Sequence, residues 1–388
     1  MKKNKGLALA ILSVSFLLML RLTISPALAT IGKAFPGVSQ GQLMNMVTLA
    51  SLMAIPFGFL AGILATKIKT RTLLFTGLGL YLVGGLGPIF ATDFTLILVL
   101  RCFLGAGTGL FLPFAAGLIA DFYEGEERNT MLGFQSTAVA LGNIVTSALA
   151  GFLATISWRL SFLIYAFAFV TLLLVAIKVP EPVRAARARE EKVFNGRLVS
   201  VLALIFLYAI IYFSFFGYLS FVVEARQLGD AAITGLATMV MTLMSMITGL
   251  FFGKLVRLFQ RFSFLVGVGL NAIGFFLLST ANVIGLIFIG AACIGLGFGF
   301  IMPYGTMKAT DAVPKAAATF ANGMFMTFIN VGTAVSPLLL IQIGNLFQNP
   351  DGQFIYRFCA ICLAVAGLVS LVLALLPEKA SKGNSQAA

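Results

Sequence analysis

The sequence contains no histidine, a single tryptophan and few charged residues. Only 10% of its 388 residues are charged, whereas 60% are apolar. Soluble globular domains average about 25% charged residues, so this composition excludes an ordinary soluble fold. The lack of histidine removes the most frequent general base, and no zinc-protease, serine-hydrolase or phosphate-loop motif is present. We therefore predict an integral membrane protein that is not an enzyme.

Cysteine is also scarce, and all four cysteines fall within long apolar segments: Cys102, Cys293, Cys359 and Cys362. The spacing of Cys359 and Cys362 is that of a metal or redox pair. However, the chain has no histidine and no second pair to complete a zinc site. We expect no metal site and no cofactor.

Apolar runs long enough to cross a membrane recur along the whole chain. A helix needs about 20 apolar residues to span a hydrocarbon core of roughly 30 Å. We count twelve such segments, at about 7–31, 43–66, 72–91, 95–119, 130–155, 159–179, 198–222, 232–253, 262–281, 284–307, 317–344 and 354–376. Each is continuously apolar rather than alternating, which favours helices over barrel strands. The predicted fold is therefore all-α, with twelve transmembrane helices.

Acidic residues are half as numerous as basic ones, giving a net charge of +13 that could indicate a nucleic-acid partner. If the N-terminus is cytoplasmic, however, 20 of the 26 Lys and Arg residues fall in cytoplasmic segments. Only Lys33, Arg159, Arg226 and Arg357 fall on the other side. This distribution is the positive-inside bias of membrane proteins. We expect a cell-membrane protein with both termini in the cytoplasm and no nucleic-acid partner.

Two copies of one pattern follow each other along the chain. Gly105, Gly107, Gly109 and Pro113 recur 190 residues later as Gly295, Gly297, Gly299 and Pro303. Asp121 matches Asp311 and Gly142 matches Gly332 at the same offset. The sequence thus predicts two six-helix halves, residues 1–180 and 198–388, joined by a charged cytoplasmic linker at 181–197. The second half ends in a short cytoplasmic tail.

The start of the chain has a second interpretation, because a basic start, an apolar run and Ala27-Leu28-Ala29 resemble a cleavable signal peptide. Cleavage would leave five helices facing six. Since the second copy keeps its first helix, we favour retention of the first helix here. Arg21 then lies about 20 Å into a membrane helix, at 1.5 Å per residue.

In order and in duplicate, these motifs resemble those of the major facilitator superfamily, in its bacterial twelve-helix type. Arg101-x-x-x-Gly105-x-Gly107-x-Gly109 is similar to that family's fourth-helix signature, and IADFYEGEERNTMLG to its loop between helices 4 and 5. The resemblance implies a secondary transporter that works by alternating access around a central cavity. We expect a small-molecule substrate and a protein that functions as a monomer in the lipid bilayer.

The resemblance and the bend-forming residues together indicate a set of residues for conformational change and gating. These are Gly62, Arg71, Gly105, Gly109, Pro113, Asp121, Arg128, Gly142, Pro303, Asp311 and Pro337.

Charge within the predicted helices is one-sided. Arg21 and Arg101 lie in mid-membrane, but no Asp or Glu does. An arginine at a helix centre costs about 2.5 to 3.5 kcal/mol on insertion scales, so it needs a carbonyl, water or an anion as partner. For Arg101 we leave scaffold and ligand contact equally open, since the family carries an arginine there. For Arg21 we favour contact with an anionic group.

Polar side chains on the cavity helices extend this site. Residues spaced three, four or seven apart share a helical face, and such faces occur in the second, fifth, eighth and eleventh helices. We predict these substrate-binding residues: Arg21, Arg101, Asn45, Asn143, Tyr208, Tyr212, Asn330 and Gln135.

The expected function is transport of a small organic solute, with an anion favoured as substrate. The alternative is a proton-coupled efflux antiporter for drugs or lipophilic compounds. The drug-antiporter members of the family that this chain resembles carry a glycine pattern in helix 5, and only Gly142 and Gly151 of that pattern are present here. A mid-membrane group that titrates near neutral pH is missing, which favours facilitated transport, anion exchange or proton movement by the substrate itself.

Overall fold

The computed structural model describes residues 5–65, 67–182, 193–314, 317–349 and 351–375. Within these ranges the regular elements are all helices, and eleven helical segments are long and apolar enough to cross a membrane. The remaining span is the 17-residue apolar helix α10 (Ser263–Ser279). The predicted all-α membrane fold is confirmed. Most of the linker and the tail, at 183–192 and 376–388, lie outside the described residues.

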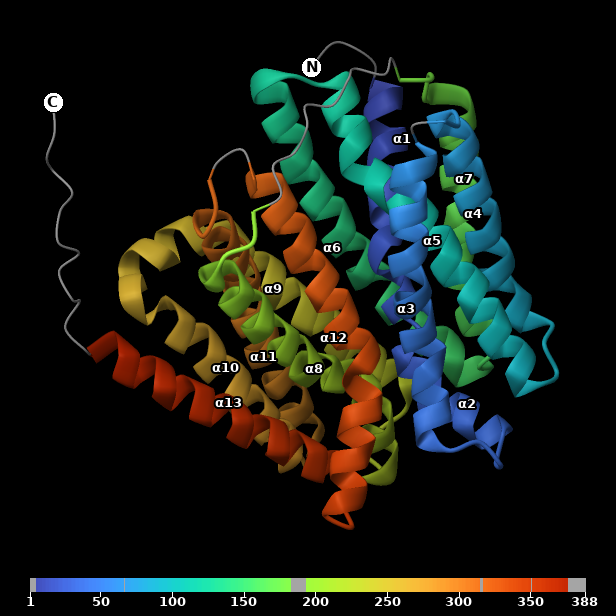
Figure 1. Ribbon diagram of the computed structural model, residues 1–388. Coiled ribbons are helices and arrows are strands. Elements are labelled where there is room, and N and C mark those ends of the chain that lie inside the picture. The colour runs from blue at the N-terminus through green and yellow to red at the C-terminus, as the bar shows by residue number, and fades with distance from the viewer. Residues whose placement is uncertain (1–4, 66, 183–192, 315–316, 350, 376–388) are drawn as a thin grey trace, which may run out of the picture.

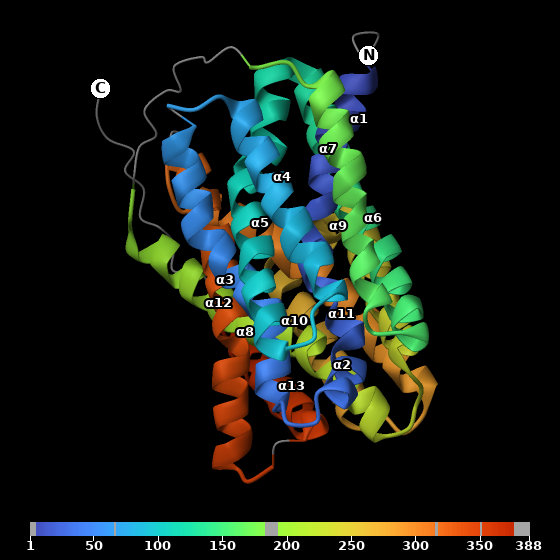
Figure 2. The same cartoon turned by 90° about the vertical axis from the view of Figure 1, so that its right-hand side faces the viewer.

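The N-terminal half contains six spans, drawn from blue to green in Figure 1. Its elements are α1 (Lys5–Phe16), η1 (Leu17–Leu22), η2 (Ser25–Ala27) and α2 (Leu28–Ala34) in the first span, then α3 (Gln40–Leu64), α4 (Thr70–Leu86) with η3 (Gly87–Ile89), α5 (Phe94–Phe122), α6 (Gly125–Ile156), and η4 (Leu160–Ala166) with α7 (Phe167–Lys178). Figure 2 shows α3, α4, α5 and α7 side by side on the face of this half.

The C-terminal half repeats the arrangement, from yellow-green to red in Figure 1. Its elements are α8 (Gly196–Ala225), α9 (Ala231–Phe259), η5 (Gln260–Phe262), α10, α11 (Ile284–Asp311), α12 (Ala318–Leu346) and α13 (Gly352–Leu375).

Helices begin where polar side chains satisfy the free N–H groups of their first turns. Asp93 caps α5, Asn195 caps α8 and Asp230 caps α9 through their side-chain oxygens. The cap of α4 comes from a distant residue, since the Glu181 carboxylate accepts from the backbone N–H groups of Thr70 and Arg71 at 2.6 and 3.1 Å. The N-terminal half is thereby fastened to the start of the linker.

The duplicated glycines pack helices against each other in the same way in both halves. A Cβ on Gly105 would lie 2.4 Å from the Ala50 carbonyl oxygen of α3, and one on Gly295 would lie 2.1 Å from the Met241 carbonyl oxygen of α9. The alternate glycine, Gly107, instead faces α4. Such close approach of backbones drives helix association in lipid, where apolar burial gives no advantage. The sequence repeat is therefore a repeat of packing.

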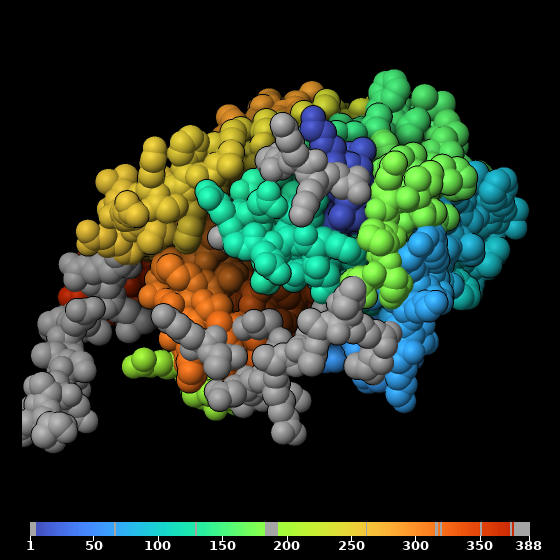
Figure 3. All heavy atoms as spheres, turned by 90° about the horizontal axis from the view of Figure 1, so that it is seen from above, coloured from blue at the N-terminus to red at the C-terminus, as the bar shows by residue number. Residues whose placement is uncertain are grey.

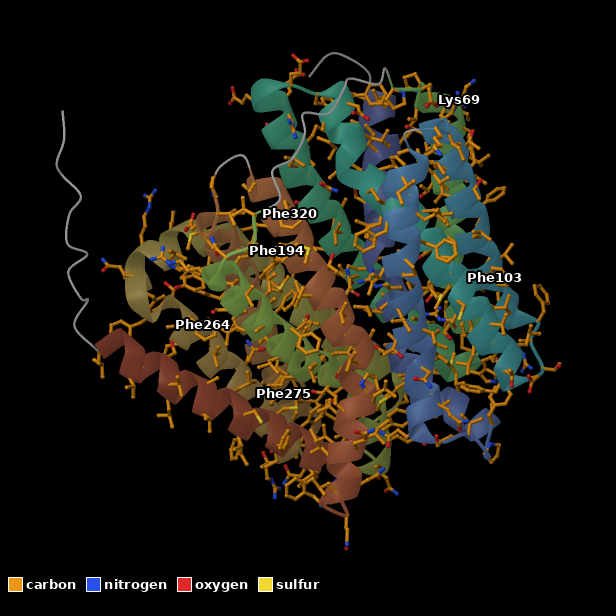
Figure 4. The ribbon with its side chains drawn as sticks, in the orientation of Figure 1. Lys69, Phe103, Phe194, Phe264, Phe275 and Phe320 are labelled. Carbon is orange, nitrogen blue, oxygen red and sulfur yellow. The ribbon has the colours of Figure 1, made fainter. Side chains whose placement is uncertain are left out.

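The two ends of the bundle differ in charge. We call one the basic end, because it carries Lys67, Lys69, Arg128, Lys254 and Lys308; Lys69 marks it in Figure 4. The other, called the opposite end, carries α2 and the loops at 90–93, 157–159, 226–230, 280–283 and 347–349. Between the ends, large apolar side chains such as Phe103 are exposed on the outer flank of the bundle (Figure 4), as expected of a surface that meets lipid.

The glycine packing gives a test of the fold. Gly105→Ala should destabilise the protein by about 1–3 kcal/mol, because the added methyl group meets backbone that cannot rotate away. Gly79→Ala is the matched control, since a Cβ at Gly79 meets nothing within 4 Å. Thermal unfolding of the detergent-purified protein should show a lower midpoint for the first variant only. Equal midpoints for both variants would contradict the packing described.

Candidate functional site

The two halves meet along two seams. One seam joins α6 to α9 and the other joins α3 to α12, while η2 and α2 of the first span pack against α8 and α9. The spans that contain α4, α7, α10 and α13 take no comparable part in these contacts among the described residues. The first, second, fifth, seventh, eighth and eleventh spans therefore form the interface between the halves. Within each half, α5 and α11 pack closely against interface helices, α5 on α3 and α11 on α9, and we call these eight spans the central helices.

Both seams are closed at the opposite end. A Cβ on Gly151 of α6 would lie 2.4 Å from the Ala231 carbonyl oxygen of α9. A Cβ on Gly41 of α3 would lie 2.7 Å from the Ile341 Cδ1 atom of α12. At this end the α6 and α9 backbones are thus in direct contact across the halves, and the α3 backbone meets a side chain of α12.

Toward the basic end the same four helices separate. In the parts of these helices nearer the basic end, four glycines have no atom within 4 Å of an added Cβ: Gly62, Gly133, Gly253 and Gly323. Ser136 and Thr137 of α6 are exposed there as well. Figure 3 views this end and shows α6 (teal) and α12 (orange) at the surface, with deeper atoms visible between them. The bundle is therefore closed at the opposite end and open toward the basic end.

An ion pair between the halves contributes to the closure. The Lys33 Nζ atom on α2 lies 2.8 Å from a Glu224 carboxylate oxygen on α8. Beneath it is a cavity of about 80 Å³, lined from both halves by residues that include Thr30, Ser220 and Thr234. This volume holds only a few water molecules. Since Lys33 is 68% exposed, the pair contributes at most about 1 kcal/mol.

Arg101 is fully buried, and each nitrogen of its guanidinium group donates a hydrogen bond to a protein oxygen atom. Its Nε donates to the Met46 carbonyl oxygen at 2.6 Å, its Nη1 to the Tyr165 hydroxyl at 2.7 Å, and its Nη2 to the Arg21 carbonyl oxygen at 2.9 Å. Four spans meet at this one side chain. The geometry is that of a scaffold, which was one of the two roles left open for Arg101.

The Arg101 cluster satisfies backbone groups released by a break in the first span. The α-helix of the first span ends at Phe16. The chain then continues in two 3₁₀ segments, η1 and η2, and Pro26 lies in η2. Besides Arg101, the Tyr165 hydroxyl donates to the Leu20 carbonyl oxygen at 3.2 Å and the Tyr81 hydroxyl to the Leu17 carbonyl oxygen at 3.4 Å. Irregular backbone at membrane depth needs such partners.

Arg21 projects from this break and is only partly satisfied. Its side chain is 7% exposed, and its Nη2 donates to the Asn330 Oδ1 atom of α12 at 2.8 Å, across the two halves. Its Nε is buried and has no hydrogen-bond partner among the described residues. The structure thus brings together two predicted site residues, Arg21 and Asn330, and leaves part of the guanidinium fork free.

The other predicted amides lie on the N-terminal half. The Asn143 side-chain amide on α6 donates to the Thr242 hydroxyl of α9 at 2.8 Å, and its Oδ1 is buried without a partner in the described part of the chain. Asn45 on α3, next to Met46, is half-buried and lies 3.5 Å from the Thr48 hydroxyl. Gln135 is half-buried on α6, nearer the basic end. Asn143 is the second predicted residue that bridges the halves.

Tyr208 and Tyr212 form an aromatic wall on the C-terminal half. Their rings stack at 5.9 Å, and Tyr212 stacks on Phe298 of α11 at 4.1 Å with an interplanar angle of 13°. The Tyr208 hydroxyl lies 3.4 Å from the Asn271 Oδ1 atom and the Tyr212 hydroxyl 3.4 Å from the Met241 sulfur. Phe298 therefore covers one face of the Tyr212 ring, and the three rings form one aromatic cluster on the C-terminal half.

Most hydroxyl groups on these helices bond within their own helix. Thr48, Thr238 and Thr248 donate to the carbonyl oxygen four residues earlier. Ser336 is an exception, since it donates to the Ile210 carbonyl oxygen of α8 at 2.6 Å. The hydroxyl groups therefore make the central surface less polar than their number suggests.

Methionine is concentrated on the central helices. Of the 14 methionines, all but Met1 and Met19 fall in α3, α6, α9, α11 and α12, and four of them fall in α9. None falls in α4, α7, α10 or α13. Methionine is flexible and polarizable and is common on binding surfaces that accept varied ligands.

The residues predicted for conformational change are placed as follows. Gly142 packs on the first-span break, since a Cβ there would lie 2.2 Å from the Phe16 carbonyl oxygen. Arg71 donates to the Ala176 carbonyl oxygen at 2.8 Å and so joins α4 to α7 within one half.

The remaining members of that predicted set lie in two places. Pro113, Pro303 and Pro337 lie inside α5, α11 and α12, respectively. Gly109 of α5 packs against α3. Asp121, Arg128 and Asp311 are exposed at the basic end.

Sequence reasoning missed several buried polar residues on the peripheral spans. Tyr81, Tyr165, Asn271 and Tyr356 each lie on one of these spans and each makes a hydrogen bond toward the central helices. A single polar group in an apolar helix is a weak signal. The 190-residue offset between Tyr81 and Asn271 was the one available clue. The Lys33 and Glu224 pair was also missed, because both residues lie at helix ends.

Comparisons with known proteins agree with the fold. A family model described as Major Facilitator Superfamily matches residues 8–229 and 204–388. The chain is 24% identical over 352 residues to the Quinolone resistance protein NorA of Staphylococcus aureus (strain N315), covering 87% of each chain. It is also 24% identical over 351 residues to Multidrug resistance protein 1 of Bacillus subtilis (strain 168), covering 85% of each.

Solved structures share the architecture at lower identity. A bacterial homolog of the lysosomal transporter Spinster, in an inward-facing and unoccupied conformation, gives a TM-score of 0.70 at 14% identity over 96% of each chain. A peptide transporter POT in complex with sulfate gives 0.75 at 15% identity over 95% of this chain and 94% of that one.

The scaffold geometry of Arg101 can be tested by stability. Arg101→Lys keeps the charge but cannot reach the three oxygen atoms together, and each buried group left unsatisfied costs about 1–3 kcal/mol. Its thermal midpoint should fall further than that of Tyr165→Phe, which removes one hydroxyl of the same cluster. A midpoint for Arg101→Lys equal to that of the unaltered protein would contradict this geometry.

Proposed function

Because the chain belongs to the Major Facilitator Superfamily, whose members are transporters, we propose that it exports amphipathic aromatic compounds that carry an anionic group. The observation that carries the proposal is the buried Arg21 side chain, whose Nε has no partner among the described residues. A carboxylate matches the guanidinium fork in geometry and charge. The route is alternating access between the two halves.

Orientation follows from the charges. The basic end faces the cytoplasm under the positive-inside bias, so both termini are cytoplasmic. The closed seams then face outward, and the conformation described is inward-facing. The chain acts as a monomer, with one pathway between its halves.

The aromatic part of the substrate class rests on the C-terminal half. Tyr212 and Phe298 stack face to face, and Tyr208 extends this aromatic cluster. The methionines on the surrounding helices favour a surface that adapts to several ring systems. The relatives' names, which refer to quinolone and multidrug resistance, support export and drug-like size. Quinolones carry a carboxylate on an aromatic ring system, so they combine both features.

Proton-coupled efflux of lipophilic cations is the second candidate, and the name of the Bacillus relative, Multidrug resistance protein 1, supports the efflux of drugs. A cation in mid-membrane needs a carboxylate or an equivalent acceptor. The sequence has no Asp or Glu in the middle of any span, and its two mid-span charges are positive. The charge distribution therefore favours anionic substrates over cationic ones.

Thermal stabilisation by ligands separates the two candidates. A panel of aromatic carboxylates, phosphates and lipophilic cations should raise the thermal midpoint of the wild-type protein only for anions, because ligand binding stabilises the folded state. Arg21→Ala should lose most of that shift. Arg357→Gln, which removes an exposed arginine on α13, is the matched control and should retain it.

Two results would overturn the proposal. One is equal stabilisation of wild type and Arg21→Ala by the anions. The other is stabilisation by cations that survives Arg21→Ala, which would favour the second candidate.

A further inference from the structure

The hydrogen bond between Arg21 and Asn330 joins the two halves in the middle of the membrane. Arg21 belongs to the first span and Asn330 to α12, 309 residues later in the chain. The donor is a buried cation and the acceptor is a neutral amide. A bond of this kind is weaker than one between arginine and a carboxylate. An anionic ligand can therefore displace Asn330 from the guanidinium.

The two ends of this bond are fixed to different degrees. The Arg101 side chain holds the Arg21 carbonyl oxygen at 2.9 Å, and Gly142 packs on the Phe16 carbonyl oxygen of the same break. Arg21 is thus anchored within the N-terminal half. Asn330 lies on a helix that meets the other half at its outer part and separates from it toward the basic end. When the halves rock, Asn330 moves relative to a stationary arginine.

Closing the central cavity at both ends removes the remaining solvent access of Arg21, whose side chain is only 7% exposed already. An unpaired guanidinium in a dry, apolar site is expensive, whereas a hydrogen-bonded one is tolerated. During that step a partner must be present. In the loaded carrier, the substrate's anionic group is the partner of the Arg21 guanidinium. In the empty carrier, the Asn330 oxygen accepts the hydrogen bond instead.

We propose that Asn330 is a coupling residue that takes the place of the substrate anion on Arg21, so that the empty carrier can change conformation. This rests on the proposed function for the nature of the substrate. Because the empty carrier can return, the protein catalyses net export. Loss of Asn330 converts it into a carrier that changes conformation only when substrate is bound.

The test uses full-length purified protein in nanodiscs, with the four native cysteines replaced and one cysteine introduced as Thr30→Cys. Thr30 lines the cavity at the closed, opposite end, so its reaction with a maleimide reports opening of that end. Without ligand, Asn330→Ala should slow labelling by about tenfold or more, because the empty carrier no longer closes over Arg21. Asn330→Gln, which keeps an amide oxygen, should restore part of the rate.

Thr327→Ala is the matched control on the same helix. Its hydroxyl donates to the Gly323 carbonyl oxygen within α12 and lies one turn from Asn330. This variant should label at the wild-type rate. Equal rates for wild type and Asn330→Ala without ligand would overturn the role of Asn330.

Addition of a ligand separates this inference from the proposed function. A fluorescent quinolone carboxylate should restore labelling of Asn330→Ala, since its anion replaces the missing acceptor, whereas tetraphenylphosphonium should not. If labelling is slow without ligand and no anion restores it, the role of Asn330 stands and the substrate class is wrong. If neither the loss of Asn330 nor the quinolone changes the rate, both fail.

Discussion

The constraint on which this structure depends is a buried positive charge that has no buried negative partner in the described part of the chain. Two arginines lie in mid-membrane and no carboxylate accompanies them. Each must find other partners, because a bare guanidinium is costly in a dry environment. The protein resolves the problem differently at the two sites. Arg101 is satisfied by three oxygen atoms of the protein, whereas Arg21 is satisfied in part by an amide from the other half.

The two arginines therefore have complementary roles. Arg101 ties the 3₁₀ break of the first span to the second, fourth and sixth spans, and one of its bonds fixes the Arg21 backbone. Arg21 then presents its side chain toward the C-terminal half from a rigid base. The repeat relation underlines the asymmetry, since Tyr212 and Ala291 stand at the equivalent positions of the second half. Charge recognition thus resides in one half and aromatic contact in the other, so a ligand that touches both links them.

Much of the fold was predictable from the sequence, because its determinants are local or repeated. Run length gave the spans, and the 190-residue offset gave the two copies and their shared glycine packing. Charge counting located Arg21 and Arg101. The pairing of Arg21 with Asn330 could not be predicted, since it joins residues 309 positions apart and depends on how the halves meet. Tyr165 was missed because its span carries few other polar residues, and nothing local to it indicates that Arg101 lies opposite.

The central claim is that Arg21 recognises an anionic group. It is tested most directly by the affinities of the purified protein for a quinolone carboxylate and for its methyl ester, which lacks the negative charge and adds only one methyl group. A charge-assisted hydrogen bond contributes about 1.5–3 kcal/mol, so the acid should bind wild type roughly ten to a hundred times more tightly than the ester. In Arg21→Gln the two affinities should become equal. An ester that binds wild type as tightly as the acid would contradict the account.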